Sequence, residues 1–397
     1  MPLPRLRPVE MVPVRHDGRH MVAVRDPEGF VEETVLLSPQ LYLVATLLDG
    51  RRDVVDVQAE YARRTGGDLL LSWDLARMLQ ELDRLSLLES EAFQQRRRAL
   101  EEAFRAAPLR PAYHAGRAYP ADPALLRQEL ERYMGEVNRE ELAGLVPRGI
   151  VAPHIDPLRG GWCYAWAYAA LAAAPVRTVL LLGVAHSGPP EPFVLTRKSF
   201  QTPLGVLAVD EAAVAELESR VGDLTRWETV HRSEHSLEFQ AIFLQHALAD
   251  RPVRIVPLLV SHLEQWAGGG SPRQVEEVER VIQALSDLAK AREGTAVVAG
   301  VDFSHVGPRF GDGEPVGPVL EARTSVRDSE ALQAVVRGDA EAFWQVVSAE
   351  GNPQRIDALS AVYVALRILE PVRGRLLRYG QAPDSTGLVS FASLALL

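Results

Sequence analysis

The sequence has one cysteine and two lysines among its 397 residues. A single thiol, Cys163, excludes an intrachain disulfide and any metal site built from several thiolates. With only Lys198 and Lys290, arginine makes up 41 of the 43 basic residues, which we interpret as a compositional bias and not as a phosphate-binding feature. An oxidising compartment is therefore not required, and Cys163 is expected to pack as a buried thiol in a helix.

Long apolar runs are also missing. No stretch approaches the ~18 to 20 apolar residues of a membrane span, and the opening MPLPRLRPVEMVPV lacks an uninterrupted apolar core of signal-peptide length. The formal net charge of -10 gives no general attraction to nucleic acid or to anionic lipid. We therefore expect a cytoplasmic protein that binds neither nucleic acid nor a membrane.

Residues 1–90 are predicted to form a small separate domain. MVPVRH and HMVAVRD read as a hairpin with its turn at Asp17 and Gly18, and three helical segments follow: SPQLYLVATLLDG, VVDVQAEYARRTGG and SWDLARMLQELDRLSLL. We interpret this domain as a winged-helix-like α+β fold. It resembles the PqqD-like modules that capture a leader peptide at a sheet edge, and a structural extension or a dimerisation module is an equal alternative. Residues 1–100 hold 14 Arg against 16 Asp and Glu, which argues against DNA binding.

Residues 91–107 are predicted to be a charged helical connector that ends near Pro108 and Pro111. From 108 to 397, strand-like runs alternate with helical ones, which predicts an α/β fold with a largely parallel sheet flanked by helices. The strand candidates are GIVAP, TVLLLGV, GVLAV, RIVPLLV, TAVVAGV and GLVSFASLAL. Helices are predicted over 162–173, 211–220, 237–249, 273–292, 327–347 and 357–369.

Four of the apolar runs are followed by a histidine: His154, His186, His262 and His305. Because the carboxyl ends of parallel strands meet at one edge of a sheet, these side chains are expected to converge. Neutral imidazole is a good ligand for Fe(II), Zn or Cu. A lone histidine in such a place is more often a structural residue, but two or more of them favour a metal site.

The segment HRSEHSLEF, residues 231–239, holds the densest cluster of titratable groups. If it is helical throughout, it matches the H-x-x-E-H pattern of inverted zinc peptidases, with His231 and His235 as ligands and Glu234 as base. Ser236 is also a candidate helix cap, and then the two histidines need not face one metal. A histidine just before a helix can instead act as a general acid or base.

The segment DFSHVG, residues 302–307, supplies a carboxylate, a hydroxyl and an imidazole directly after the TAVVAGV run. Asp302 either completes a two-histidine, one-carboxylate site, which is the usual non-haem iron arrangement, or orients a ligand histidine.

The order of these motifs resembles that of the Memo family. The matching strings run from 108 to 397 and are RPAYHAGRAYPADPALLRQEL, GIVAPHIDP, VLLLGVAHSG, FQTPLGVLAVD, HRSEHSLEFQ, RIVPLLVSH, VVAGVDFSHVG and GLVSFASLAL. Bacterial members are often named AmmeMemoRadiSam system protein B, after a grouping with a radical SAM protein. The resemblance implies a fold similar to that of class III extradiol dioxygenases, in which two histidines and a carboxylate hold non-haem iron.

The resemblance also implies roles for individual residues. His154 and His186 match metal-ligand positions, and His235 matches an acid/base histidine that faces the same cleft. Ser304 matches the position where animal members place a ligating cysteine, and a neutral hydroxyl is a poor replacement for a thiolate. The candidates for the third ligand are Asp302, His305, His235 and water.

The chain departs from the family directly after His154, where IDPLRGG replaces the common AGY. Asp156 and Arg159 add charge at the pocket mouth, where they either bind a polar substrate or pair with each other. The residues expected to line the site are therefore Asp156, Glu234, Asp302, Ser304 and His305.

Three functions follow from these residues. The first is a metal-dependent oxidoreductase of the non-haem iron dioxygenase type, with Fe(II) as the expected metal and Zn or Cu as alternatives. The second is a non-catalytic binding or scaffold component that recognises a peptide or a partner such as a radical SAM protein. The third is a zinc peptidase that acts through HRSEH.

Overall fold

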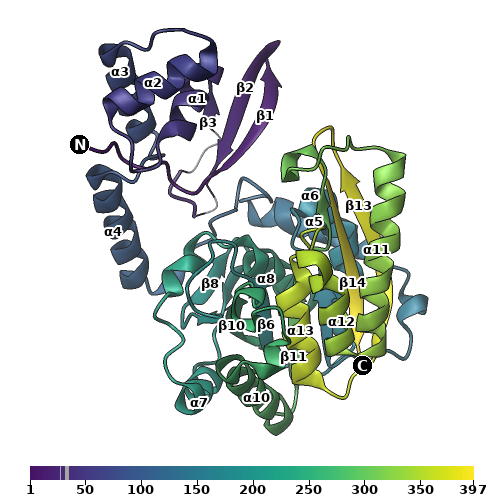
Figure 1. The fold of residues 1–397 in the computed structure, drawn as a ribbon. Helices are drawn as coiled ribbons and strands as arrows, with labels where there is room; N and C mark the ends of the chain where they lie inside the picture. The colour runs from purple at the N-terminus through teal and green to yellow at the C-terminus, as the bar shows by residue number, and fades with distance from the viewer. Residues whose placement is uncertain (27, 32–34) are drawn as a thin grey trace. The chain divides into compact units, whose positions relative to one another are not determined.

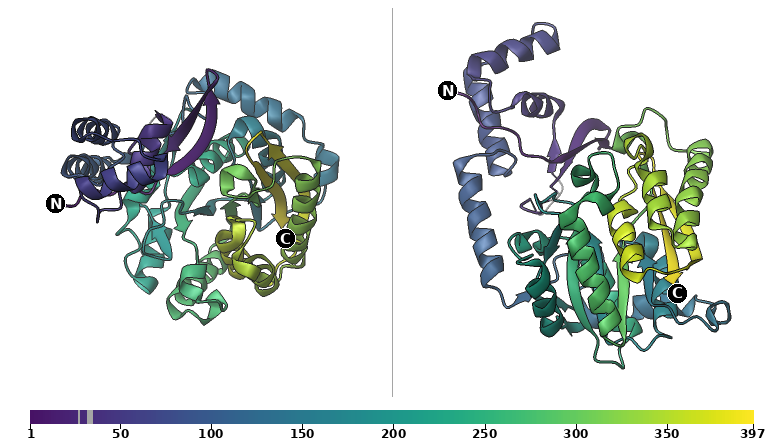
Figure 2. Two further views of the ribbon diagram at one scale, coloured as in Figure 1. Left: turned by 45° about the horizontal axis from the view of Figure 1, so that its top comes forward. Right: turned by 60° about the horizontal axis from the view of Figure 1, so that its bottom comes forward.

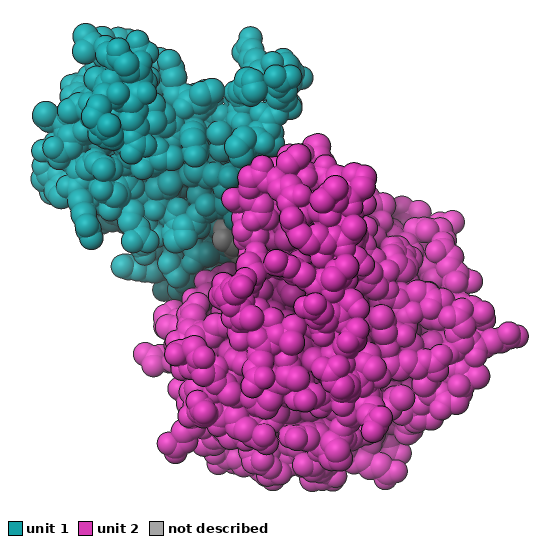
Figure 3. Space-filling model, turned by 45° about the vertical axis from the view of Figure 1, so that its right-hand side comes forward, with its two compact units in different colours: residues 1–107 teal, residues 108–397 magenta. Residues whose placement is uncertain are grey.

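The computed structural model describes residues 1–26, 28–31 and 35–397, and it divides into two compact units, Met1–Ala107 and Pro108–Leu397 (Figure 3). In the described part of the chain, no helix combines the length and the apolar character needed to cross a membrane.

The described residues of the first unit form a three-stranded antiparallel sheet and four helices. Strand β1 (Glu10–His16) pairs with β2 (Arg19–Arg25), which pairs with β3 (Val35–Leu37). The predicted hairpin is confirmed, and Asp17 and Gly18 have φ values of 48° and 75°, as a tight turn between two strands requires. The helices are α1 (Pro39–Leu47), α2 (Val54–Thr65), α3 (Ser72–Arg84) and α4 (Glu91–Ala106). The core of the unit lies between the sheet and the first three helices.

The second unit is built on an eight-stranded mixed sheet. The strand order is β12-β14-β5-β11-β6-β10-β7, and β13 pairs with β14. The expected parallel pairing holds for the four central strands, β5 (Gly149–Ala152), β11 (Thr295–Gly300), β6 (Thr178–Val184) and β10 (Arg254–Val260). Antiparallel pairing extends the sheet on both sides, through β7 (Phe193–Leu195) and through β12 (His305–Val306), β13 (Gly374–Pro383) and β14 (Leu388–Leu396).

One predicted strand lies outside this sheet. The run GVLAV forms β9 (Gly205–Leu207), which pairs with β8 (Ser199–Thr202) in a small sheet that also contains β4 (Leu109–Arg110). The length and apolar character of a run predict a strand but not the strand with which it pairs. Here β9 pairs with β8, its nearest neighbour along the chain.

Helices cover both faces of the large sheet (Figure 1). One face carries α5 (Pro123–Gly135), α6 (Pro157–Leu171) and α8 (His235–Ala247), and the other carries α7 (Glu211–Val221), α10 (Glu276–Ala291) and α13 (Ala358–Leu369). Figure 2 shows these layers from two other directions. Cys163 is buried in α6, as expected from the sequence.

The predicted helix 327–347 is two helices, α11 (Pro318–Arg337) and α12 (Ala340–Ser348). Gly338 ends α11 with a left-handed φ of 71°, and the side chain of Asp339 caps α12, so two local signals break the helix. The shorter helices of the second unit are α9 (Glu264–Ala267), η1 (Arg139–Leu142), η2 (Glu228–Arg232), η3 (Pro272–Gln274), η4 (Pro308–Phe310) and η5 (Ala349–Gly351).

Candidate metal centre

Two strand-end histidines and an aspartate meet at the carboxyl edge of the large sheet. His154, Asp302 and His186 each follow their strand by two residues, after β5, β11 and β6 respectively. Because β11 lies between β5 and β6 and is parallel to both, Asp302 is placed between the two histidines along this edge. His262 follows β10, which is further from the centre of the sheet, and it does not join their cluster.

A third histidine, His235, comes from the first turn of α8, which packs directly on the strand ends. A Cβ atom added to Gly183 would lie 2.5 Å from Ser236 Oγ, and one added to Gly300 would lie 2.5 Å from the backbone oxygen of Ser236. The N–H of Val184 donates to Ser236 Oγ at 3.0 Å. Since both strands lack a side chain at the contact, the helix start sits close enough for His235 to reach the edge.

The segment HRSEH is not one helix. Its first residues belong to the 3-10 helix η2, and α8 begins only at His235. The cap of α8 is Glu234, whose Oε1 accepts the N–H of Ser236 at 2.9 Å. The prediction that Ser236 is the cap was wrong, because its hydroxyl bonds to β6 instead.

His231 points away from the cluster. Its side chain is fully buried, and its Nε2 donates to the carbonyl oxygen of Val194 at 3.0 Å. Burial lowers the pKa of His231 to about 3, so the ring is neutral. The two histidines of the zinc-peptidase pattern therefore do not face one metal position.

His154, His186 and His235 form a cluster in which one ligand nitrogen from each ring lies within 4.8 Å of the others. The ring centroids are 5.0 Å apart for His154 and His186, 5.0 Å for His154 and His235, and 4.6 Å for His186 and His235. Nitrogens that share one tetrahedral ion at ~2.1 Å lie about 3.4 Å apart, so two nitrogens at the 4.8 Å limit would have to approach by about 1.4 Å to bind one ion.

Each of the three rings has a partner at its Nδ1 atom. The Nδ1 of His154 lies 3.2 Å from the carbonyl oxygen of Gly300, and the Nδ1 of His186 lies 3.0 Å from Glu234 Oε1. The Nδ1 of His235 lies 3.4 Å from the same oxygen. Because these oxygens accept, the Nδ1 atoms of His154 and His186 carry hydrogen, so a metal would bind through the Nε2 atoms and replace the Nε2 proton of a charged ring.

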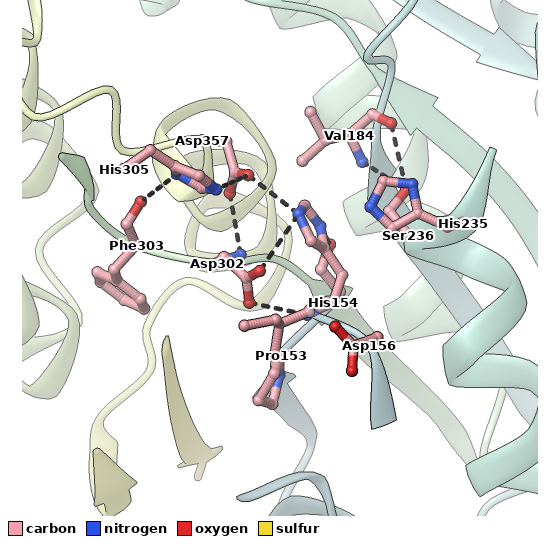
Figure 4. A network of polar contacts seen from close by, with 12 residues as sticks. Pro153, His154, Asp156, Val184, His235, Ser236, Asp302, Phe303, His305 and Asp357 are labelled. Atoms are coloured by element: carbon pink, nitrogen blue, oxygen red, sulfur yellow. Dashed lines mark hydrogen bonds and ion pairs between the residues drawn. The ribbon is translucent and has the colours of Figure 1, made fainter. Parts of the chain in front are cut away.

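Asp357, which no sequence pattern singles out, lies directly before α13 and among the rings (Figure 4). Its Oδ2 lies 3.0 Å from His154 Nε2, 3.8 Å from His305 Nε2 and 4.0 Å from His186 Nε2. Its Oδ1 accepts the N–H of Asp302 at 2.9 Å. The only sequence signal is an acidic residue before an apolar helix, which is typical of ordinary helix caps.

The charges at this edge favour a cation. Burial alone lowers the pKa of His154, but the carboxylates of Asp357 and Asp302 outweigh burial and raise that pKa to about 10. Burial likewise raises the pKa of Asp357, and the positive charge of His154 outweighs it and lowers the pKa to about 2. Burial lowers the pKa of His235 well below its usual value, so this ring stays neutral.

Ser304 does not face the cluster. Its hydroxyl donates to Asp328 Oδ1 at 2.5 Å, and the hydroxyls of Ser390 and Tyr379 donate to Asp328 Oδ2 at 2.5 and 2.7 Å. Ser304 and Asp328 are both fully buried. The position that the family resemblance relates to a ligating cysteine is therefore used here in an internal hydrogen-bond network.

Asp302 and Asp156 make well-defined contacts. Asp302 Oδ1 accepts the N–H of His154 at 3.0 Å, and its Oδ2 lies 3.7 Å from His154 Nε2. Asp156 accepts the Nε–H of Arg159 at 2.5 Å and also the backbone N–H of Arg159. Asp156 and Arg159 therefore pair with each other.

A buried ion pair fixes the segment that leads into α8. Arg110 and Glu238 are both fully buried and form a salt bridge. Arg110 also donates to the backbone oxygens of His231 and Glu234, at 2.7 and 2.6 Å. Glu238 accepts the hydroxyl of Tyr119 at 2.6 Å. The backbone from His231 to Glu234 is thus tied to the start of the unit, which helps to hold the Glu234 carboxylate in place.

Known proteins match this chain over both units. The profile of the Memo-like protein family matches residues 110–395. A MEMO1 family protein of Aquifex aeolicus is 31% identical over 379 residues, which cover 94% of each chain. MEMO1 family proteins of Thermus thermophilus and Methanopyrus kandleri are 31% and 28% identical over 330 and 286 residues, covering 83% and 69% of this chain and 93% and 92% of theirs.

The Aquifex alignment is longer than the second unit, which has 397 − 107 = 290 residues. Most of the first unit is therefore shared with that relative and is not peculiar to this chain. Because the family profile spans almost all of the second unit, and the motifs of the site fall within it, the chain belongs to the Memo-like protein family.

Proposed function

We propose that this protein is a metal-dependent oxidoreductase of the non-haem iron dioxygenase type, with Fe(II) as its metal and Zn or Cu as alternatives. The observation that supports the proposal is the cluster of His154, His186 and His235, whose ligand nitrogens lie within 4.8 Å of one another. The donors at the edge are imidazole nitrogens and carboxylate oxygens, a set that suits Fe(II), Zn and Cu.

In this proposal His154 and His186 hold the metal through Nε2, because their Nδ1 atoms are already engaged. Fe(II) bound there would supply open positions for a substrate and dioxygen. His235 is the acid/base group because its ring lies beside both ligand rings, with its centroid 5.0 Å from that of His154 and 4.6 Å from that of His186. Glu234 orients His186 and keeps its ring turned toward the site.

The proposal extends to the fold and to a partner. A class III extradiol dioxygenase-like fold for residues 108–397 is supported by the parallel central strands with the histidines at their carboxyl ends. A winged-helix-like first unit is supported by its three antiparallel strands and its three consecutive helices. We assign that unit the recognition of a peptide or of a partner such as a radical SAM protein.

The test is metal analysis after anaerobic purification. We expect about one equivalent of metal, present on purification or regained with Fe(II), and its loss in His154→Ala and His186→Ala. His246→Ala, on the partly exposed surface of α8, is the matched control and should keep the metal. A wild type that holds less than about 0.2 equivalents of metal, and regains none from Fe(II), Zn or Cu, would contradict the proposal.

A second measurement separates metal binding from oxidation. The Fe(II)-loaded protein should consume dioxygen when it is mixed with a panel of catechols, and His235→Ala should slow this uptake. If the protein binds metal but consumes no dioxygen with any of the catechols, the result would support metal binding and contradict the dioxygenase assignment.

A further inference from the structure

The position of Asp357 is not explained by its helix. It stands at the N-cap position of α13, where an aspartate normally accepts a backbone N–H from the first turn. Its side chain makes no such bond. The carboxylate is 11% exposed and faces the histidines at the strand ends. The start of α13 therefore places a negative charge beside these histidines.

The carboxylate is fixed with one oxygen turned toward the rings. Asp357 Oδ1 accepts the N–H of Asp302 at 2.9 Å, which sets the plane of the group. Oδ2 then faces the Nε2 atoms of His154 at 3.0 Å and of His186 at 4.0 Å. In Figure 4 the ring of His305 lies on the opposite side of Asp357 from His154, with its Nε2 at 3.8 Å from the same oxygen.

Asp302 is the competing carboxylate, and its geometry is less suited to a metal. Its Oδ1 accepts the N–H of His154, and its Oδ2 lies 3.7 Å from the Nε2 of that ring. Atoms that bind one ion at ~2.1 Å lie about 3 to 3.4 Å apart. The pair Asp357 and His154, at 3.0 Å, already has this spacing.

We propose that Asp357 is the carboxylate ligand of this centre and forms a two-histidine, one-carboxylate site with His154 and His186. Asp302 then acts as a positioning residue, which holds the backbone of His154 and, through its own N–H, the carboxylate of Asp357. His235 is left free of the metal for acid/base work. The inference rests on the proposed function, because it places the metal at His154 and His186.

The test compares two isosteric variants, Asp357→Asn and Asp302→Asn, by calorimetric titration of the full chain with Zn(II). We expect the wild type to bind one equivalent, Asp302→Asn to lose at most about tenfold in affinity, and Asp357→Asn to lose more than about a hundredfold. Asp328→Asn, which changes a buried carboxylate that accepts the hydroxyls of Ser304, Tyr379 and Ser390, controls for the loss of a buried charge and should keep its affinity within about tenfold.

The outcomes separate the two proposals. A wild type that binds no Zn(II), Fe(II) or Cu(II) overturns the metal centre and this inference with it. A wild type that binds metal, with Asp357→Asn equal to it or with Asp302→Asn the weaker of the two, overturns only the assignment of Asp357.

Far-UV circular dichroism and a thermal melt establish that each variant is folded. If Asp357→Asn does not fold, X-ray absorption at the zinc edge decides between the carboxylates. If the oxygen ligand of the zinc persists in Asp302→Asn, the assignment of Asp357 as the ligand is supported. If that oxygen ligand disappears in Asp302→Asn, the assignment of Asp357 is overturned.

Discussion

Glu234 accepts the Nδ1–H of His186 at 3.0 Å and, through the same oxygen, the N–H of Ser236 at 2.9 Å. One carboxylate therefore both orients a ring of the cluster and begins the helix that carries His235. His186 and Glu234 lie on different elements, a strand end and a helix start, so this bond links the two sides of the centre.

Replacing Glu234 by Gln should weaken metal binding by about ten- to a hundredfold, because an amide is a weaker acceptor for the ring of His186. The helix should persist, since the amide oxygen can still accept the N–H of Ser236. Titration with Zn(II) measures the change, and Glu211→Gln, in the exposed first turn of α7, is the control. Equal affinities of Glu234→Gln and the wild type would contradict the role of the carboxylate.

Gly183→Ala should displace the start of α8. The added Cβ would lie 2.5 Å from Ser236 Oγ and 2.7 Å from a methyl carbon of Leu237, in a fully packed region. Such overpacking costs about 1 to 3 kcal/mol, so the urea midpoint should fall and Zn(II) affinity should fall with it, because His235 and Glu234 move.

Gly135→Ala is the matched control for that variant. Gly135 ends α5, and an added Cβ would meet nothing within 4 Å. The substitution should leave the urea midpoint unchanged or raise the free energy of unfolding by up to about 1 kcal/mol. Equal effects of the two alanines would show that the close approach at Gly183 does not position the helix.

The sequence predicts the part of the centre that depends on strand ends. His154 and His186 each follow an apolar run, and parallel pairing alone brings such residues together. Asp357 follows no such rule, because its place depends on where α13 crosses the sheet after a long intervening chain. A break in HRSEH was among the alternatives that the sequence left open, but the cap is Glu234 and not Ser236, and H-x-x-E-H gives no sign that Gly183 and Gly300 admit the helix start.

Ser304→Ala should lower stability without changing metal affinity. Its hydroxyl is one of three that bond to the buried carboxylate of Asp328, and loss of one donor costs about 1 to 3 kcal/mol. Ser390→Ala removes another donor to the same carboxylate and should cost a similar amount. Urea unfolding and Zn(II) titration measure the two properties. A loss of more than about tenfold in Zn(II) affinity for Ser304→Ala alone would show that this hydroxyl contacts the metal.

His231 should make the protein less stable in acid. Its Nε2 donates to Val194 and its Nδ1 has no hydrogen-bond partner among the described residues, so a second proton would place an unpaired charge in the interior. Burial lowers the pKa of the folded protein's His231 to about 3, against ~6.5 in the unfolded chain.

Between these two values the unfolded chain binds a proton that the folded protein does not, so stability falls as the pH is lowered through the unfolded pKa and levels off near the folded one. The free energy of unfolding should therefore drop by about 1.7 kcal/mol more for the wild type than for His231→Gln between pH 6.5 and pH 5. Urea titrations with EDTA at each pH measure the difference. His246→Gln, where the ring is partly exposed, should reduce the pH dependence much less. Parallel curves for the wild type and His231→Gln would mean that the His231 ring takes up its proton while the protein is still folded.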